Sequence, residues 1–503
     1  MAPSLFSLAH GESPPSKRLK STLPNGRSLH DDVNAETEII QPHPLRIKPS
    51  GNAFTSSTNL RDTSCGQLAL FPDELILQVL GYLVADDLNA LAATSKALYG
   101  FSRTEELWKA LFIGSAASET AFTWRGTWRR TLLDLPESRE VHIALPDLYS
   151  DALYRPFHMS QIPLAPFVSN IPPRNQIRRF PDLTEAQFNG EYSSMPFILT
   201  SPVKAWSGYR DDHWTYQSLE RSYGDVRFRA ESVDWRLSDY ISYMENQTDE
   251  SPLYLFDRHF VTKTQGALES GFAAPACFGR DFFEVLGADR PDHRWLILGP
   301  ARSGSTFHKD PNATSAWNAV LQGEKYWIMF PPNTPPPGVF VSQDQSEVTS
   351  PLSIAEWLVG FHRAARGMQG CIEGVCRAGE VLHVPSGWWH LVVNTAPSLA
   401  LTQNFIPSTQ LPAALEFLDV QRQSVSGFNC DRVADPYGLF VQRMEESFPK
   451  ELAAARDAIE ARKRNKKRNR WGDLVGEKKE KKEGGIGFSF AFGFGGADDS
   501  DDE

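Results

Sequence analysis

The tripeptide His308-Lys309-Asp310 constrains this chain more than any other short segment. On an extended strand, side chains two positions apart point to the same face, so His308 and Asp310 would lie together while Lys309 points away. A second histidine, His390, follows far downstream in a Gly-Trp-Trp-His segment. Two imidazoles and one carboxylate can hold Fe(II) and leave three adjacent positions open. The pattern predicts a β-rich fold with a non-haem iron site, although a lone His-x-Asp tripeptide also arises by chance.

Lys325 and Thr402 extend this pattern toward an anionic ligand. Lys325 lies in an apolar run just after Gly323, which predicts a hairpin between two strands. A lysine that faces inward needs an anion, because an unpaired buried ammonium is costly, and a dicarboxylate cosubstrate would supply one. Thr402 falls on the apolar strand 399–405, where its hydroxyl can bond the same carboxylate. Taken singly, each residue also fits a plain structural role.

Several segments, in this order along the chain, resemble the jumonji-C oxygenases, in particular the lysyl-hydroxylase branch once called the phosphatidylserine receptor. The resemblance covers about residues 190 to 410. The matching segments are 251–257, 299–304, 314–318, 384–390 and 402–405. The resemblance implies a double-stranded β-helix, a jelly-roll or cupin-like fold, in which His308, Asp310 and His390 hold Fe(II). It also implies that 2-oxoglutarate is the cosubstrate and dioxygen the oxidant. The residues implied to hold or line the 2-oxoglutarate pocket are Lys325, Thr402, Asn318, Tyr254, Trp295, Ser305 and Asn404.

The function implied by this resemblance is an Fe(II)/2-oxoglutarate-dependent protein oxygenase that hydroxylates lysine side chains of protein substrates. Histone or arginine demethylation is an alternative output of the same centre. The chain lacks the Gly-x-Ser-x-Gly elbow of serine hydrolases and the Gly-rich fingerprints of nucleotide-binding loops. Lys309 within the triad and the Pro-rich insert 331–337 depart from the family pattern, so they do not indicate which substrate is used.

A small helical module precedes the oxygenase segment. Pro72, Asp73 and Glu74 suit a helix start, because proline is tolerated in the first turn and acids complement the positive helix end. Leu75 and Val79 continue at helical spacing, a stripe that most often belongs to a core. The order of motifs over residues 67 to 112 nevertheless resembles an F-box. It implies docking on a Skp-type adaptor of a cullin–RING ubiquitin ligase, and hence the alternative function of a substrate receptor whose β-helix serves for recognition.

The 503 residues, 41% of them hydrophobic, suffice for more than one domain. Five cysteines are few and odd in number, which favours reduced thiols, and Cys371 and Cys376 lack the further partners of a zinc site. No apolar run reaches the roughly 18 residues of a membrane helix, so we expect no membrane contact. The predicted α+β organisation is a disordered tail (1–60), an F-box (65–112), a connector packed on the core (113–190), the jumonji-C domain (191–410), C-terminal helices (411–464) and a basic, then Gly/Phe-rich and acidic disordered tail (465–503).

Two basic segments stand out against the net charge of −11. The cluster Lys17-Arg18-Leu19-Lys20 predicts nuclear import, with or without a cytoplasmic pool, although it also fits a solvated charge cluster. The run 462–470 fits a second import signal, a weak RNA contact through phosphates, or an ordinary solvated helix end.

Overall fold

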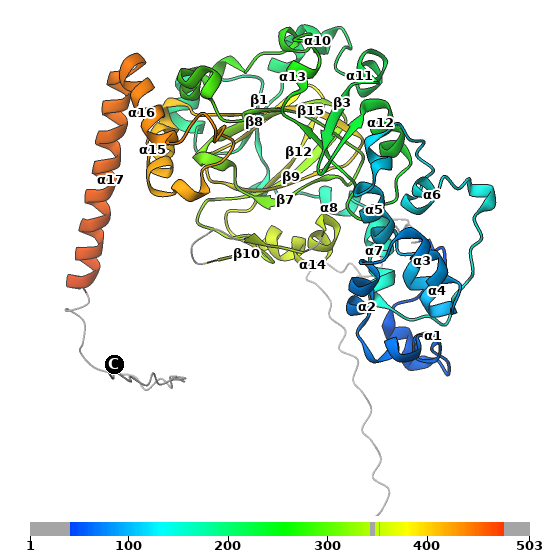
Figure 1. Cartoon of the computed structure of the whole chain (residues 1–503). Coiled ribbons are helices and arrows are strands. Elements are labelled where there is room, and N and C mark those ends of the chain that lie inside the picture. Colours follow the sequence, from blue (N-terminus) through cyan, green and yellow to red (C-terminus); the bar gives the residue numbers. More distant parts are fainter. Residues whose placement is uncertain (1–40, 343–347, 352, 477–503) are drawn as a thin grey trace, which may run out of the picture.

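The computed structural model describes residues 41–342, 348–351 and 353–476 (Figure 1). The cluster 17–20 and the Gly/Phe-rich and acidic segments lie outside these residues, as do the side chains of the basic run from residue 466 onward. Both predicted tail boundaries need correction. Leu45 and Ile47 are buried within the first predicted tail, because two apolar side chains in that segment pack on the helical module. The last helix continues to Gly476, since Lys and Arg are good helix formers.

Two β-sheets form the centre of the molecule and confirm the predicted double-stranded β-helix. The larger sheet has the order β1-β2-β13-β8-β15-β6-β5-β3-β4, and the smaller one β12-β9-β14-β7. Strands β8 and β14 are buried along nearly their whole length, as expected where both faces of a sheet are covered. The bounds of the strands in the larger sheet are β1 Arg178–Phe180, β2 Phe197–Leu199, β3 Arg227–Ala230, β4 Val233–Arg236, β5 Leu255–Asp257, β6 Arg294–Gly299, β8 Ser315–Gln322, β13 Glu380–Val384 and β15 Ser398–Phe405. Those of the smaller sheet are β7 Gly304–His308, β9 Glu324–Phe330, β12 Ile372–Arg377 and β14 Trp389–Asn394, and a separate pair consists of β10 Phe340–Val341 and β11 Val348–Thr349.

The chain crosses between the two sheets at Gly323, where the sequence predicted a hairpin. β8 belongs to the larger sheet and β9 to the smaller one, so the two strands do not pair with each other. Gly323 has φ 78°, and a Cβ there would collide with the carbonyl oxygen of Pro397. The glycine therefore marks a tight turn, as predicted, but the turn is a corner of the β-helix. This corner places Lys325 on the smaller sheet, opposite the larger one.

Helices surround the sheets, and the first five include the F-box-like module (Figure 1). Ser95 begins α4 by accepting a hydrogen bond from the Leu98 amide. The helices of the amino-terminal half are α1 Leu60–Ser64, α2 Asp73–Leu80, α3 Ala85–Ala92, α4 Lys96–Ser102, α5 Glu105–Ile113, α6 Trp128–Leu132, α7 Asp151–Gln161, α8 Ala165–Val168, α9 Glu185–Gln187, α10 Ser207–Arg210, α11 Tyr216–Tyr223 and α12 Leu237–Asn246. The remaining helices are α13 Phe260–Lys263, α14 Ile354–Gly367, α15 Leu411–Val420, α16 Pro436–Ser447 and α17 Pro449–Gly476.

The F-box-like helices are fused to the β-helix by a continuous apolar core, whereas the sequence suggested a separate unit. Phe112 of α5 packs edge-to-face on Trp235 of β4, with ring centroids 5.9 Å apart. The rings of Trp128 in α6 and Tyr243 in α12 also pack together, with their centroids 5.3 Å apart. Asp249 joins the same elements, accepting hydrogen bonds from the Trp128 indole (2.7 Å) and Lys109 (2.9 Å). Local periodicity does not reveal such long-range packing.

A separate apolar core lies at the carboxyl-terminal end, where α15, α16 and the first turns of α17 pack together with Phe282 and Phe283. Figure 1 shows this group on the opposite side of the β-helix from α2 to α4. Within the described residues, no helix combines the length and the apolar character that a membrane crossing requires.

Candidate metal and cosubstrate site

The predicted metal ligands meet at one end of the smaller sheet. His308 is the last residue of β7 and lies directly opposite His390 of β14, with ring centroids 4.1 Å apart. Asp310 follows on an extended backbone, with φ −62° and ψ 147°. One potential ligand atom from each of the three side chains lies within 4.8 Å of the other two. Cross-strand pairing thus supplies two ligands on one face, and the chain leaving β7 supplies the third.

Backbone hydrogen bonds orient both imidazoles. His308 Nδ1 lies 2.7 Å from the carbonyl oxygen of Thr306, and His390 Nδ1 lies 3.0 Å from that of Trp388. Because a carbonyl oxygen only accepts, each Nδ1 carries a proton, which leaves each Nε2 as the ring nitrogen available to a metal. A histidine that binds a metal through one ring nitrogen usually donates such a hydrogen bond from the other.

The electrostatics of the triad fit a divalent cation. With no cation beside it, burial raises the pKa of Asp310 to about 6, against the opposing effects of His308 and of a hydrogen bond from Asn404. Burial and the neighbouring His308 hold the pKa of His390 well below its usual value, so this imidazole is neutral. Asp310 Oδ2 has no hydrogen-bond partner among the described residues. A cation would compensate the buried carboxylate and accept the imidazole lone pairs, which suits a two-nitrogen, one-oxygen ligand set.

The larger sheet faces the triad with a row of cosubstrate candidates. Thr402 of β15 lies opposite Trp295 of β6 on one side and Asn318 of β8 on the other. The Thr402 hydroxyl donates a hydrogen bond to the carbonyl oxygen of Trp317 (2.9 Å), and the buried amide oxygen of Asn318 has no partner in the described structure. These three residues line a cavity of about 340 Å³, the iron cavity, whose wall also includes Tyr254, Ser305, His308, Asp310, His390 and Asn404.

Lys325 lies behind this wall and does not itself line the cavity. Its ammonium donates hydrogen bonds to the Tyr254 hydroxyl (2.5 Å) and to Asn394 Oδ1 (3.0 Å), and its side chain is fully buried. No described carboxylate pairs with it, and burial lowers the pKa of Lys325 to about 7. A buried cation with no anion, one hydrogen bond away from a cavity wall, fits the distal carboxylate of a dicarboxylate ligand.

Asn394 is a site residue that the sequence reasoning missed. It lies opposite Lys325 in the strand register, is fully buried, and bonds the Ser303 hydroxyl through Nδ2 (3.0 Å). Asn394 therefore connects the ammonium of Lys325 to the loop that precedes β7. A signal was present: Asn394 is four residues past His390 on the same strand, so the two side chains share a face.

Two imidazoles, one carboxylate and a buried lysine, enclosed between the sheets of a jelly-roll, define a non-haem metal oxygenase that uses an oxo-acid cosubstrate. Comparisons with known proteins agree. A "Cupin-like domain" model matches residues 192–410, and an "F-box-like" model matches residues 68–114.

Three relatives illustrate the similarity. The chain is 36% identical to arginine-specific demethylase JMJ22 of Arabidopsis thaliana over 83% of its own length and 84% of the relative's. It is 34% identical to the bifunctional arginine demethylase and lysyl-hydroxylase psr-1 of Caenorhabditis elegans, over 47% and 63%. It is 31% identical to the 2-oxoglutarate and iron-dependent oxygenase JMJD4 of Homo sapiens, over 45% and 59%. The chain belongs to the jumonji-C family of Fe(II)- and 2-oxoglutarate-dependent oxygenases.

The metal ligands and Lys325 come from the smaller sheet or from the chain that leaves it. When bound, iron couples the oxidative decarboxylation of 2-oxoglutarate to the hydroxylation of a C–H bond. His308, Asp310 and His390 would hold it, and they line the iron cavity together with Asn318 and Thr402 of the larger sheet. Lys325, held by Tyr254 and Asn394, would fix the distal end of the cosubstrate and so orient its keto acid end.

Proposed function

We propose that this oxygenase hydroxylates lysine side chains of protein substrates. The observation that carries the proposal is the composition of the iron cavity, which the rings of Tyr254, Phe256, Trp295 and Trp327 line together with the triad. Apolar walls of this kind suit the aliphatic stem of a lysine, whose ammonium can remain in a polar environment. The lysyl-hydroxylase activity in the name of the relative psr-1 supports the same reaction.

Arginine demethylation is a second candidate, favoured by the name and the long match of the relative JMJ22. Both outputs begin with hydroxylation at a carbon, because a hydroxylated N-methyl group breaks down to formaldehyde. They differ in which substrate carbon lies nearest the metal.

One experiment tests both candidates. Purified protein is incubated with Fe(II), 2-oxoglutarate, dioxygen and a peptide library that contains lysines and methylated arginines, with Asp310→Ala as the matched control. Lysyl hydroxylation predicts succinate together with one added oxygen on a lysine, whereas demethylation predicts formaldehyde and loss of a methyl group. Succinate formation no greater than that of the control would contradict the oxygenase reaction itself.

We also infer that the F-box-like module docks on a Skp-type adaptor. Leu75 and Val79 of α2 are 37% and 46% exposed, while Ile76 and Leu80 of the same helix form the core. Further exposed apolar side chains lie just before and just after α2, so that the exposed apolar residues of this segment are Leu70, Phe71, Leu75, Val79, Tyr82 and Val84. Many exposed apolar side chains within one short segment favour a protein partner. Loss of adaptor co-purification on changing these side chains would support the inference, and its persistence would contradict it.

A further inference from the structure

The turn that follows Asp310 has an uncommon backbone conformation. Asn312 and Ala313 are both left-handed, with φ of 56° and 52°. Asparagine enters this region readily, but alanine does so rarely, because its Cβ crowds the following carbonyl oxygen. Such a conformation persists only where the surrounding structure holds it in place. We call residues 311–314 the metal turn, because the chain enters it directly from Asp310.

Asn312 joins the metal turn to a distant segment through both ends of its side-chain amide. Its Nδ2 donates a hydrogen bond to the carbonyl oxygen of Ser426 at 2.9 Å, and its Oδ1 accepts one from the Ser426 amide at 3.1 Å. We call this pair of bonds the clamp. Asn312 is only 3% exposed, so the clamp lies in surroundings that strengthen hydrogen bonds. Because the clamp uses the backbone of Ser426, it fixes the path of that segment relative to the turn.

The segment that contains Ser426 belongs to the carboxyl-terminal helices. It connects α15 to α16, beyond the segment that the cupin-like model matches. Helix α15 itself lies against the metal turn. Next to Ser426, the carbonyl oxygen of Gly427 accepts a hydrogen bond from the Asp292 amide at 2.9 Å. Phe428 packs edge-to-face on Phe283, with ring centroids 6.3 Å apart. The clamp therefore ties the metal turn to a segment that is itself held by further contacts.

The metal turn also contacts the chain that leads to the second histidine. The hydroxyl of Ser386 donates a hydrogen bond to the carbonyl oxygen of Ala313 at 2.6 Å. Ser386 lies four residues before His390, in the loop between β13 and β14. A displacement of the turn would therefore affect Asp310 directly and His390 through Ser386. Outer contacts that hold metal ligands in place commonly account for about tenfold or more in metal affinity.

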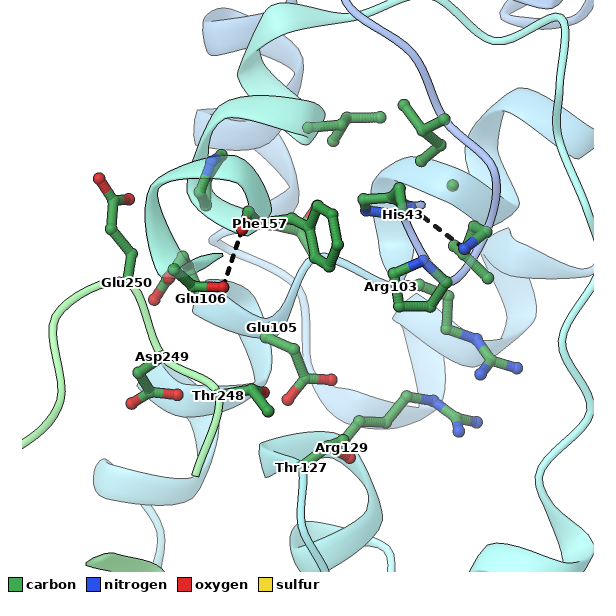
Figure 2. A pocket seen from close by; sticks show the side chains of 18 of the residues that line it. His43, Arg103, Glu105, Glu106, Thr127, Arg129, Phe157, Thr248, Asp249 and Glu250 are labelled. Atoms are coloured by element: carbon green, nitrogen blue, oxygen red, sulfur yellow. Dashed lines mark hydrogen bonds between the residues drawn. The ribbon is translucent and has the colours of Figure 1, made fainter. Parts of the chain in front are cut away.

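On the opposite flank, the F-box-like module meets the β-helix at a cavity of about 230 Å³. Figure 2 shows Asp249 and Glu250 on one side of this cavity and Arg103 and Arg129 on the other. Both arginines pair with Glu140 at 3.1 Å. None of the described residues that line this cavity also lines the iron cavity. The carboxyl-terminal helices, by contrast, reach the metal turn directly.

We propose that Asn312 is a positioning residue for the metal ligands, and that the clamp couples metal binding to the packing of α15 and α16. The clamp keeps the metal turn in its left-handed conformation, which holds Asp310 beside His308 and His390. The metal site is common to both candidate reactions, so the inference does not depend on which substrate is oxidised. It extends the working parts of the metal site to helices beyond the cupin-like domain.

Coupling of this kind is reciprocal. If the clamp strengthens metal binding by a given factor, bound metal must stabilise the closed clamp by the same factor. The Ser426 amide reports on the clamp, because its hydrogen exchanges slowly with water while its bond to Asn312 Oδ1 is intact. Metal affinity and hydrogen exchange therefore measure the same coupling free energy in two ways.

The test uses the full chain with Mn(II) and without 2-oxoglutarate, so that no turnover is involved. Electron paramagnetic resonance measures the Mn(II) affinity, and mass spectrometry measures hydrogen exchange in the peptide that contains Ser426. Asn312→Gly removes the clamp but still allows the left-handed backbone, which glycine adopts freely. Asn170→Gly is the matched control, because Asn170 is also left-handed (φ 53°) but lies exposed in the loop after α8. Thr248→Ala, in the cavity of Figure 2, is a second control on the F-box-like side.

We expect Asn312→Gly to weaken Mn(II) binding about tenfold, at the low end for contacts that support metal ligands. Mn(II) should slow hydrogen exchange at Ser426 by about the same factor in the wild type, and should have no such effect in Asn312→Gly. Both control variants should bind Mn(II) like the wild type and show the slowed exchange.

Unchanged Mn(II) affinity in Asn312→Gly would overturn the inference. Exchange at Ser426 that is equally fast with and without Mn(II) in the wild type would also overturn it. This second measurement needs no variant, so the test stays decisive if Asn312→Gly fails to fold. A similar loss of affinity in the two control variants would count against the inference too, because the effect would then not depend on the clamp.

Discussion

Replacing Lys325 with methionine should stabilise the cosubstrate-free protein while weakening its binding of 2-oxoglutarate. A pKa that falls from 10.5 to about 7 on burial corresponds to a cost on the order of 4 kcal/mol at neutral pH. The methionine removes that cost but leaves Asn394 Oδ1 without its donor, a loss of about 1–3 kcal/mol. The net expectation is a gain of roughly 1–3 kcal/mol in the free energy of unfolding.

The same substitution removes a charge-assisted bond to the distal carboxylate, worth about 1.5–3 kcal/mol, so the affinity for 2-oxoglutarate should fall between about tenfold and 150-fold. Denaturant unfolding measures the first effect, and anaerobic titration of 2-oxoglutarate measures the second. Metal binding should persist in the variant, because Lys325 is not one of the three candidate metal ligands.

The stability of the Lys325→Met variant relative to wild type should depend on pH. The pKa of Lys325 is lower in the folded protein than in the unfolded chain, so the destabilisation is complete below about pH 7 and disappears as pH rises toward 10.5. The advantage of the Lys325→Met variant should therefore be largest near pH 6 and vanish in alkaline solution. A variant that is less stable than wild type at pH 6 and binds 2-oxoglutarate normally would refute the assignment and make Lys325 a structural residue.

Three further changes probe other parts of the molecule. Asp310→Ala should abolish succinate formation and weaken binding of Mn(II), followed by electron paramagnetic resonance, without unfolding the protein, because its Oδ2 makes no hydrogen bond in the described structure; retained turnover would contradict its role. Asn394→Ala should raise the KM for 2-oxoglutarate about tenfold with little change in kcat, because it positions Lys325; equal losses in both constants would point to a general structural defect. The double change Leu75→Glu and Val79→Glu should abolish adaptor pull-down and spare turnover, since both side chains are exposed. By contrast, Ile76→Ala should lower the free energy of unfolding by about 2–5 kcal/mol. Adaptor binding that survives the double change would exclude this face as the docking site.

Nuclear localisation stays a proposal that rests on the cluster 17–20. A fluorescent fusion with Lys17, Arg18 and Lys20 changed to alanine should accumulate in the cytoplasm, and an unchanged nuclear signal would refute this role for the cluster.

The fold was predicted by the resemblance to the jumonji-C oxygenases, and part of the site by a short-range rule. Side chains alternate along a strand, so the common face of His308 and Asp310 follows from their spacing. The resemblance then supplied residues from distant strands, and the structure brings Asn318, Thr402 and Trp295 into one row. Their roles in binding 2-oxoglutarate remain predictions.

What the sequence did not predict depends on contacts between distant segments. A glycine between two apolar runs indicates a turn at Gly323, but not whether the strands pair or lie in different sheets. Asn394 looked like any strand residue, because its importance arises from Lys325 on the neighbouring strand. The stripe of α2 divides into the core residue Ile76 and the exposed Leu75, a distinction that depends on where the next helices pack.

The aromatic contacts between α5 and β4 have a consequence for how this protein melts and for how it can be taken apart. Phe112 and Trp235 are both nearly inaccessible to solvent, so neither module can unfold without exposing large apolar surface on the other. A single calorimetric transition is expected, in place of the two that a flexibly tethered pair of modules would show. For the same reason, a fragment that begins near residue 190 would expose Trp235 and Tyr243 and should aggregate. The F-box-like module therefore cannot be transferred to another protein by itself. A chimera that contains it must also contain β4 and α12.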